Sequence, residues 1–242
     1  MPFTAYGAYD VALAGMEFGH EMDHQRITKA AYGTFDFGDP VFGQKGDDDR
    51  GYMLDKIRVT FSADFVASNT INGSIAGLPI AQVTYGTDHA TTFAAVVAAI
   101  DALAGVSIAA SSASARTIDI SIPKTKIAAT FTVAAGSSQA VASYSLTADR
   151  YLIGIVKRVQ KAKIDETVGA RFLETEAMAV TTVGEIHVDT ADAVDSGSLV
   201  YLTTSGAWTD ATTGAVLATS YYFRSSTAAA GVARVLTIAK NA

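Results

Sequence analysis

The stretch Asp195-Ser196-Gly197-Ser198-Leu199-Val200-Tyr201-Leu202 decides the fold class of this 242-residue chain. A turn of small residues precedes an apolar strand, and the chain closes with a similar strand at Gly231-Val232-Ala233-Arg234-Val235-Leu236-Thr237-Ile238. Short apolar segments separated by turn residues are typical of compact β-domains. Neither stretch gathers the nucleophiles, acids and bases that a catalytic site needs. We therefore expect a domain that presents strand edges and loops.

The rest of residues 150–242 continues this pattern. Strands are predicted at 151–159, 180–183, 186–188, 199–202, 221–224 and 234–238, with turns at 189–197, 204–206 and 228–231. Their short and regular spacing predicts a β-sandwich or barrel. A helical turn is expected within 172–178.

Residues 1–54 are rich in aromatic residues and glycine but show no lasting period. We expect an extended arm with short strands, and turns or loops at Asp39-Pro40 and at 46–49. Large rings on such an arm need cover, either on their own domain or on a neighbouring subunit. For the second alternative, the candidate contact residues to a capsid or to another protomer are Pro2, Phe3, Tyr6, Tyr9 and Phe18.

Residues 55–149 are predicted to form a separate unit inserted between 1–54 and 150–242. Apolar residues alternate in three segments, 57–61, 118–122 and 127–133, as half-buried strands require, and 80–85 is interpreted as a return strand. Asn72-Gly73 predicts a hairpin turn, because both residue types accept positive φ. The small, polar stretch 134–145 is interpreted as the exit linker.

One helix is predicted in this unit. Apolar residues from Phe93 to Leu103 recur at helical spacing, with Thr87 or Asp88 as the N-cap and Gly105 at the end. The order is therefore β-β-α-β-β. The predicted fold class is mainly β, with a sandwich-like or barrel-like base and a small α+β insertion, which a surface loop accepts at low cost.

Composition excludes several classes of function. The formal net charge is −6, which does not suit the phosphate backbone of nucleic acids. There is no cysteine, so disulfides and thiolate chemistry make no contribution. We find no signal peptide and no apolar stretch long enough to cross a bilayer. We expect neither a nucleic-acid nor a membrane partner.

The stretch His20-Glu21-Met22-Asp23-His24 matches the H-E-x-x-H pattern of zinc peptidases. There two histidines one helical turn apart bind zinc, and the glutamate activates a water. Here Gly19 weakens any helix, Asp23 places a charge where those enzymes carry apolar residues, and no third ligand is evident. We interpret His20, Glu21 and His24 as a chance match, and expect no metal, no cofactor and no enzymatic activity.

Other polar candidates have simpler interpretations. The run Asp47-Asp48-Asp49 lacks the alternating ligand spacing of an EF-hand, so it is interpreted as a solvated acidic turn. His89 is placed near a helix start, and His187 on the solvent side of its strand. Neither has a nucleophile and third partner in sequence context. Trp208 is expected to be a core or rim ring.

Three segments resemble the capsid cement (decoration) proteins of tailed phages. They are the C-terminal strands above, the opening Pro2-Phe3 to Ala14-Gly15 with Phe37-Gly38-Asp39-Pro40-Val41, and Thr60-Phe61-Ser62-Ala63-Asp64-Phe65-Val66 to Asn72-Gly73 with the Ala-rich helix. The resemblance implies a β-tulip-like base domain and a structural virion protein. Such a protein is made in the bacterial cytoplasm, binds the outside of the capsid and bridges adjacent major capsid subunits. It also implies a homo-oligomer, with a trimer favoured over a dimer.

Two alternatives stay open at this point. A tail, baseplate or fibre component would share the β-rich, small-residue composition and would form rings or filaments. A host-surface adhesion module would bind glycans through residues 55–148. Both alternatives, like the cement interpretation, assign no catalytic residue to the chain.

Overall fold

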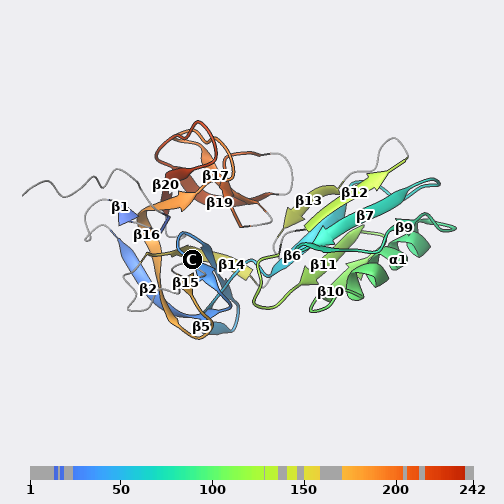
Figure 1. The fold of residues 1–242 in the computed structure, drawn as a ribbon, viewed down its shortest axis with the longest axis horizontal. Coiled ribbons are helices and arrows are strands. Elements are labelled where there is room, and N and C mark those ends of the chain that lie inside the picture. The colour runs from blue at the N-terminus through green and yellow to red at the C-terminus, as the bar shows by residue number, and fades with distance from the viewer. Residues whose placement is uncertain are drawn as a thin grey trace, which may run out of the picture.

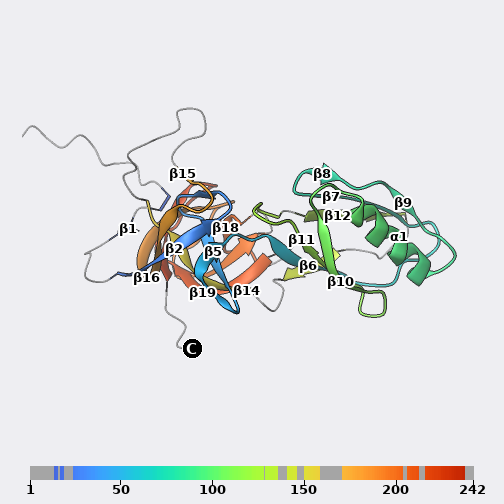
Figure 2. The ribbon, with the colours of Figure 1, turned by 90° about the horizontal axis from the view of Figure 1, so that it is seen from below.

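The computed structural model describes residues 14–15, 17–18, 24–127, 129–135, 141–145, 150–158, 171–203, 206–212 and 216–237. These residues are 54% strand and 7% helix, so the expected mainly-β fold class is confirmed. They include one helix, α1 (His89–Asp101). Figures 1 and 2 both show two groups of strands side by side along the long axis, with β6 to β13 and α1 in one group.

Five strands of the other group close into a barrel. Around it, β2 (Gln25–Tyr32) pairs with β5 (Asp47–Tyr52), β5 with β4 (Pro40–Gln44), β4 with β14 (Arg150–Val156), and β14 with β16 (Ala177–Asp189), which returns to β2. A short pair, β3 (Phe35–Asp36) and β15 (Arg171–Phe172), lies beside it. One cluster of buried residues belongs to these strands and their connections: Ala31, Phe35, Phe37, Val41, Met53, Val156, Phe172, Met178 and Val180.

Strand β16 also belongs to a second sheet. Its second half pairs with β20 (Val232–Thr237), followed by β19 (Val216–Phe223), β17 (Leu199–Thr203) and β18 (Trp208–Thr209). The short strand β1 (Glu17–Phe18) pairs with the opposite edge of β16. The predicted strands at 151–159, 180–183, 186–188, 199–202, 221–224 and 234–238 all coincide with strands, and 180–183 and 186–188 are joined in β16. The first ends at Val156 instead of 159, and residues 159 and 238 lie outside the described part of the chain.

Two expectations for these regions are wrong. Residues 25–52, expected in an extended arm, supply three barrel strands, because rings such as Phe35 and Phe42 pack inward with no exposed surface. When short strands are linked by tight turns, the alternation of apolar and polar residues is interrupted too often to be recognised in the sequence. No helical turn forms within 172–178, where a turn at residues 174–175 joins β15 to β16.

Residues 56–145 contain two four-stranded sheets. One has the order β10-β11-β6-β13, and the other joins β12, β7 and β8, with β9 also paired to β7. The bounds are β6 (Lys56–Phe61), β7 (Thr70–Ile75), β8 (Leu78–Pro79), β9 (Val83–Thr84), β10 (Ser107–Ser112), β11 (Thr117–Ser121), β12 (Ala129–Ala134) and β13 (Val141–Ser145). Helix α1 begins as expected, with the Asp88 side chain accepting a 2.7 Å hydrogen bond from the Thr91 amide.

Two local predictions for this region are also wrong. Asn72-Gly73 lies inside β7, and the turn is at Ala76-Gly77, whose φ angles are +49° and +79°. Gly73 serves a different need: a Cβ there would lie 2.6 Å from the Thr130 carbonyl oxygen on β12. The predicted exit linker contains β13, which pairs with β6.

A buried ion pair joins the chain where it enters and leaves residues 56–145. Arg150 Nη2 lies 2.9 Å from Asp55 Oδ1, and each side chain is only 3% exposed. The guanidinium also donates to Gln44 Oε1 at 2.7 Å and lies 3.8 Å from the centre of the Tyr52 ring. A second contact is made by Lys126, which binds Asp39 Oδ1 at 2.7 Å. These contacts fasten the two groups of strands to each other.

Candidate interaction surface

One face of the second sheet is buried and the other is exposed. Residues paired across antiparallel strands point to the same side of the sheet. Leu199 is paired with Tyr222, Tyr222 with Leu236, and Leu236 with Glu185. These four residues therefore form a row across the outer face, where Leu199 is 41% and Tyr222 is 40% exposed. The residues that alternate with them are completely buried: Val200, Phe223, Val235 and Ile186.

Two arginines complete this face. Arg224 Nε lies 3.3 Å from Glu185 Oε1, and Arg234 Nη1 lies 3.3 Å from Glu185 Oε2. The Arg224 side chain is 54% exposed. We call Leu199, Tyr222, Leu236, Glu185, Arg224 and Arg234 the outer patch. Tyrosine and arginine beside exposed apolar area are the residues that protein interfaces favour.

Strand β1 borders the outer patch and is held by a polar network. Glu17 receives hydrogen bonds from Arg26 at 2.8 Å and Thr181 at 2.7 Å, and pairs with Lys157 at 2.7 Å. Burial alone would raise the pKa of Glu17, but these partners outweigh it and hold the pKa at about 2. The network therefore fastens β1 to the barrel through one ionised carboxylate.

Most of the predicted contact residues lie outside the described part of the chain. These are Pro2, Phe3, Tyr6 and Tyr9. Phe18 belongs to β1, where its backbone is paired with Glu185 of the outer patch. Its role in contacts with other subunits stays a prediction.

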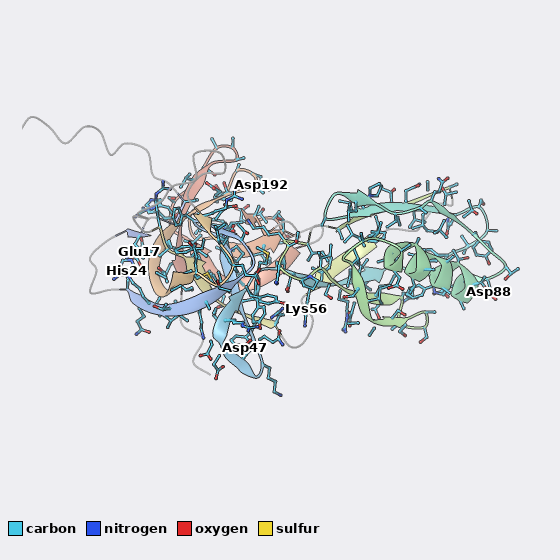
Figure 3. All side chains as sticks on the ribbon, turned by 60° about the horizontal axis from the view of Figure 1, so that its bottom comes forward. Glu17, His24, Asp47, Lys56, Asp88 and Asp192 are labelled. Carbon is cyan, nitrogen blue, oxygen red and sulfur yellow. The ribbon has the colours of Figure 1, made fainter. Side chains whose placement is uncertain are left out.

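Of the H-E-x-x-H motif, the part of the chain that the structure describes includes only His24. His20 and Glu21 lie outside the described residues, and His24 directly precedes strand β2. Its Nε2–H donates to the Glu185 carbonyl oxygen at 3.1 Å. Its ring covers Gly184, where a Cβ would lie 2.1 Å from the imidazole. His24 thus has a local structural role between β2 and β16 (Figure 3).

The acidic run lies at a hairpin rather than in a loop. The turn is formed by Lys45 and Gly46, and Asp47 to Asp49 begin strand β5. Asp47 accepts a 2.5 Å hydrogen bond from the Tyr52 hydroxyl, which holds its pKa below the usual value. Asp48 and Asp49 are exposed.

The two remaining histidines and the tryptophan have structural positions. His89 Nδ1 accepts from the Phe65 amide at 2.8 Å, and its Nε2–H donates to the Ala113 carbonyl at 3.0 Å. His187 is half-buried between two buried strand residues, as its alternation predicted. Trp208 is 2% exposed and donates to the Gly38 carbonyl at 2.9 Å, so it is a core ring.

A small polar pocket lies where the two groups of strands meet. It has a volume of about 190 Å³ and is lined by Asp36, Phe37, Gly38, Asp39, Lys126, Asp189, Gly206, Ala207 and Trp208. Burial raises the pKa of Asp39, while the Lys126 ammonium opposes this effect. Asp39 therefore has a structural role, because its ion pair with Lys126 joins the two groups of strands.

In the part of the chain that the structure describes, no three His, Cys, Asp or Glu side chains are grouped to hold a metal ion. The same residues include no helix with the length and hydropathy needed to cross a membrane. No protein-family model matches the chain, and no curated protein matches it significantly.

Sequence reasoning did not find the outer patch, the Glu17 network or the Asp55–Arg150 pair. Each depends on strands that are distant in sequence: Glu17 and Thr181 are 164 positions apart, and Asp55 and Arg150 are 95 apart. The signal that could have indicated the patch is Tyr222, an aromatic residue on the outward register of a strand that also carries Arg224.

Proposed function

We propose that this chain is a structural virion protein that binds the outer surface of a tailed-phage capsid and cements adjacent major capsid subunits. The observation that carries the proposal is the outer patch, where exposed Leu199 and Tyr222 lie beside an exposed guanidinium on a sheet continuous with a closed barrel. Exposed apolar area of this kind marks a surface that associates with another protein chain. A protein that bridges capsid subunits as a homo-oligomer needs such surfaces for contacts between its own copies as well as with the capsid. The resemblance of three sequence segments to capsid cement proteins supplies the identity of that assembly.

The proposal includes a division into two parts. Residues 1–54 and 150–242 form the β-tulip-like base that binds the capsid, and residues 55–149 form an inserted α+β domain. Two observations support this division. The strands of the two four-stranded sheets all come from residues 56–145, and the Asp55–Arg150 pair joins the chain where it enters and leaves them.

Rigidity matters for such a role. A shell offers many identical sites, so modest contacts at each site become strong when one assembly binds several of them. This gain is lost when the linked surfaces cannot reach their sites together. The buried ion pair and the Lys126–Asp39 contact hold the two parts in one arrangement, as bridging requires.

Electron microscopy of the phage particles that carry this protein tests the proposal. We expect density for the chain at fixed symmetry positions on the outside of the head, and none there in particles that lack its gene. Density confined to the tail would contradict the proposal and favour the tail-component alternative. Heads without the density, together with glycan binding by the purified chain, would favour the adhesion alternative.

A further inference from the structure

Arg224 has unused capacity to bind an anion. Its Nε contacts Glu185, but its two terminal nitrogens make no hydrogen bond to any described residue. The side chain is 54% exposed and lies next to exposed Tyr222. A guanidinium binds a carboxylate best through two parallel N–H···O bonds, and apolar neighbours strengthen this pair by excluding water. The outer patch is therefore suited to a partner that presents carboxylates.

The same chain presents carboxylates at the start of β5, beside the Lys45-Gly46 turn that forms the tip of the β4–β5 hairpin. Asp48 and Asp49 are exposed, and neither carboxylate has a partner among the described residues. The neighbouring Asp47 is already bound to Tyr52. The tip projects from the barrel, since a Cβ placed on Gly46 would have no atom within 4 Å. Figure 3 shows the labelled Asp47 at this lower end of the molecule.

These two surfaces lie apart on the same group of strands. In the sheet order, β2, β16 and β20 separate β5 from β19, which amounts to roughly 20 Å at the usual spacing of strands. Figure 1 shows β5 at the bottom and strands β17 and β20 above it. The tip therefore cannot reach the patch of its own molecule, and a contact between them joins two copies.

We propose that the Asp48–Asp49 tip of one copy docks on the outer patch of a second copy, with Arg224 as the anion-binding residue. The contact joins two different surfaces, so it is head-to-tail, and a head-to-tail contact closes into a ring when the rotation between copies permits. The inference goes beyond the capsid proposal and would stand if that proposal failed. It is tested with the purified full chain alone.

Variants with exchanged charges test the proposed contact between the hairpin tip and the outer patch. We expect the wild-type chain to self-associate in light scattering coupled to size exclusion, with association that weakens as salt rises. Arg224→Glu and the pair Asp48→Arg with Asp49→Arg should each weaken the self-association constant roughly tenfold or more, by placing like charges together. Combining all three changes should restore most of the association, because the pair is reformed with its signs exchanged.

The control variant is Asp101→Lys, which changes an exposed carboxylate at the end of α1. It should leave the association constant unchanged. Thermal unfolding of every variant shows that each one is folded. A wild-type chain that stays monomeric at high concentration and low salt would overturn the inference. So would folded single-surface variants that associate as the wild type does, or a combined variant that is no better than either parent.

Discussion

Individual charged residues hold separate parts of this chain in place. Glu17 fastens β1 beside the outer patch, and the Asp55–Arg150 pair lies at the boundary of residues 56–145. Both groups are largely buried, and a buried charge is tolerated only with partners in good geometry. Removing one partner should therefore cost far more than removing an exposed pair.

The Glu17 network should make the attachment of β1 sensitive to acid. The pKa of Glu17 is about 2 in the folded chain, below its ordinary value of 4.5. The unfolded chain thus binds the proton more readily, so the stabilisation is complete above about pH 4.5 and is lost as the pH falls towards 2. Protection from hydrogen exchange, taken relative to the intrinsic exchange rate at each pH, should fall over this range at residues 14, 15, 17 and 18, and more than it falls at α1.

Glu17→Gln should remove most of that pH dependence and should speed exchange already at pH 7. Glu174→Gln is the matched control, since its partner Lys124 is bound at 2.6 Å with both side chains 44% exposed. An exposed pair of this kind contributes under about 1 kcal/mol. Equal behaviour of the two variants would contradict the role given to Glu17.

Breaking the Asp55–Arg150 pair should be strongly destabilising. Asp55→Asn or Arg150→Met alone leaves one buried charge unpaired, and we expect a loss of about 3–5 kcal/mol in the free energy of unfolding. The double variant should lose clearly less than the sum of the two single losses, because it leaves no lone charge. Urea unfolding measures all three. Additive losses would show that the two side chains act independently.

At the scale of elements, the close approach of β7 and β12 depends on one glycine. Gly73→Ala should destabilise the chain by about 1–3 kcal/mol, because its Cβ would lie 2.6 Å from the Thr130 oxygen and 2.7 Å from the Phe131 ring. Gly231→Ala is the control, since its nearest atom would be 3.7 Å away, an ordinary contact. Urea unfolding that finds equal stability for the two variants would contradict this account of β7.

Elements with a clear local signal could be predicted from the sequence. The apolar stripe and Asp88 located α1, and alternation located β6, β11, β17 and β20. The prediction of a hairpin turn at Asn72-Gly73 was wrong. A glycine that permits a close contact between strands cannot be distinguished in the sequence from one that permits a turn. The small residues of β10 gave no period, and its role depends on pairing with β11. The alternation of Tyr222 and Arg224 could have indicated part of the outer patch. Its other members could not be predicted, because they come together only once strand register is known.

At the scale of the whole molecule, a barrel and a second sheet share β16, and residues 56–145 are fastened beside them by buried contacts. Such a molecule is built to keep its surfaces in a fixed arrangement, which suits our proposal that it bridges subunits of a shell. The outer patch and the hairpin tip give it two different adhesive surfaces, and copies joined through them would extend the span of each bridge.

The temperature at which phage heads release their DNA tests the cementing role most directly. Heads with and without this protein should be heated in parallel, with DNA release followed by a dye. The account predicts that heads lacking the protein release DNA at a lower temperature, and that adding the purified chain restores the original value. Identical release temperatures for the two kinds of head, at full occupancy of the protein, would contradict it.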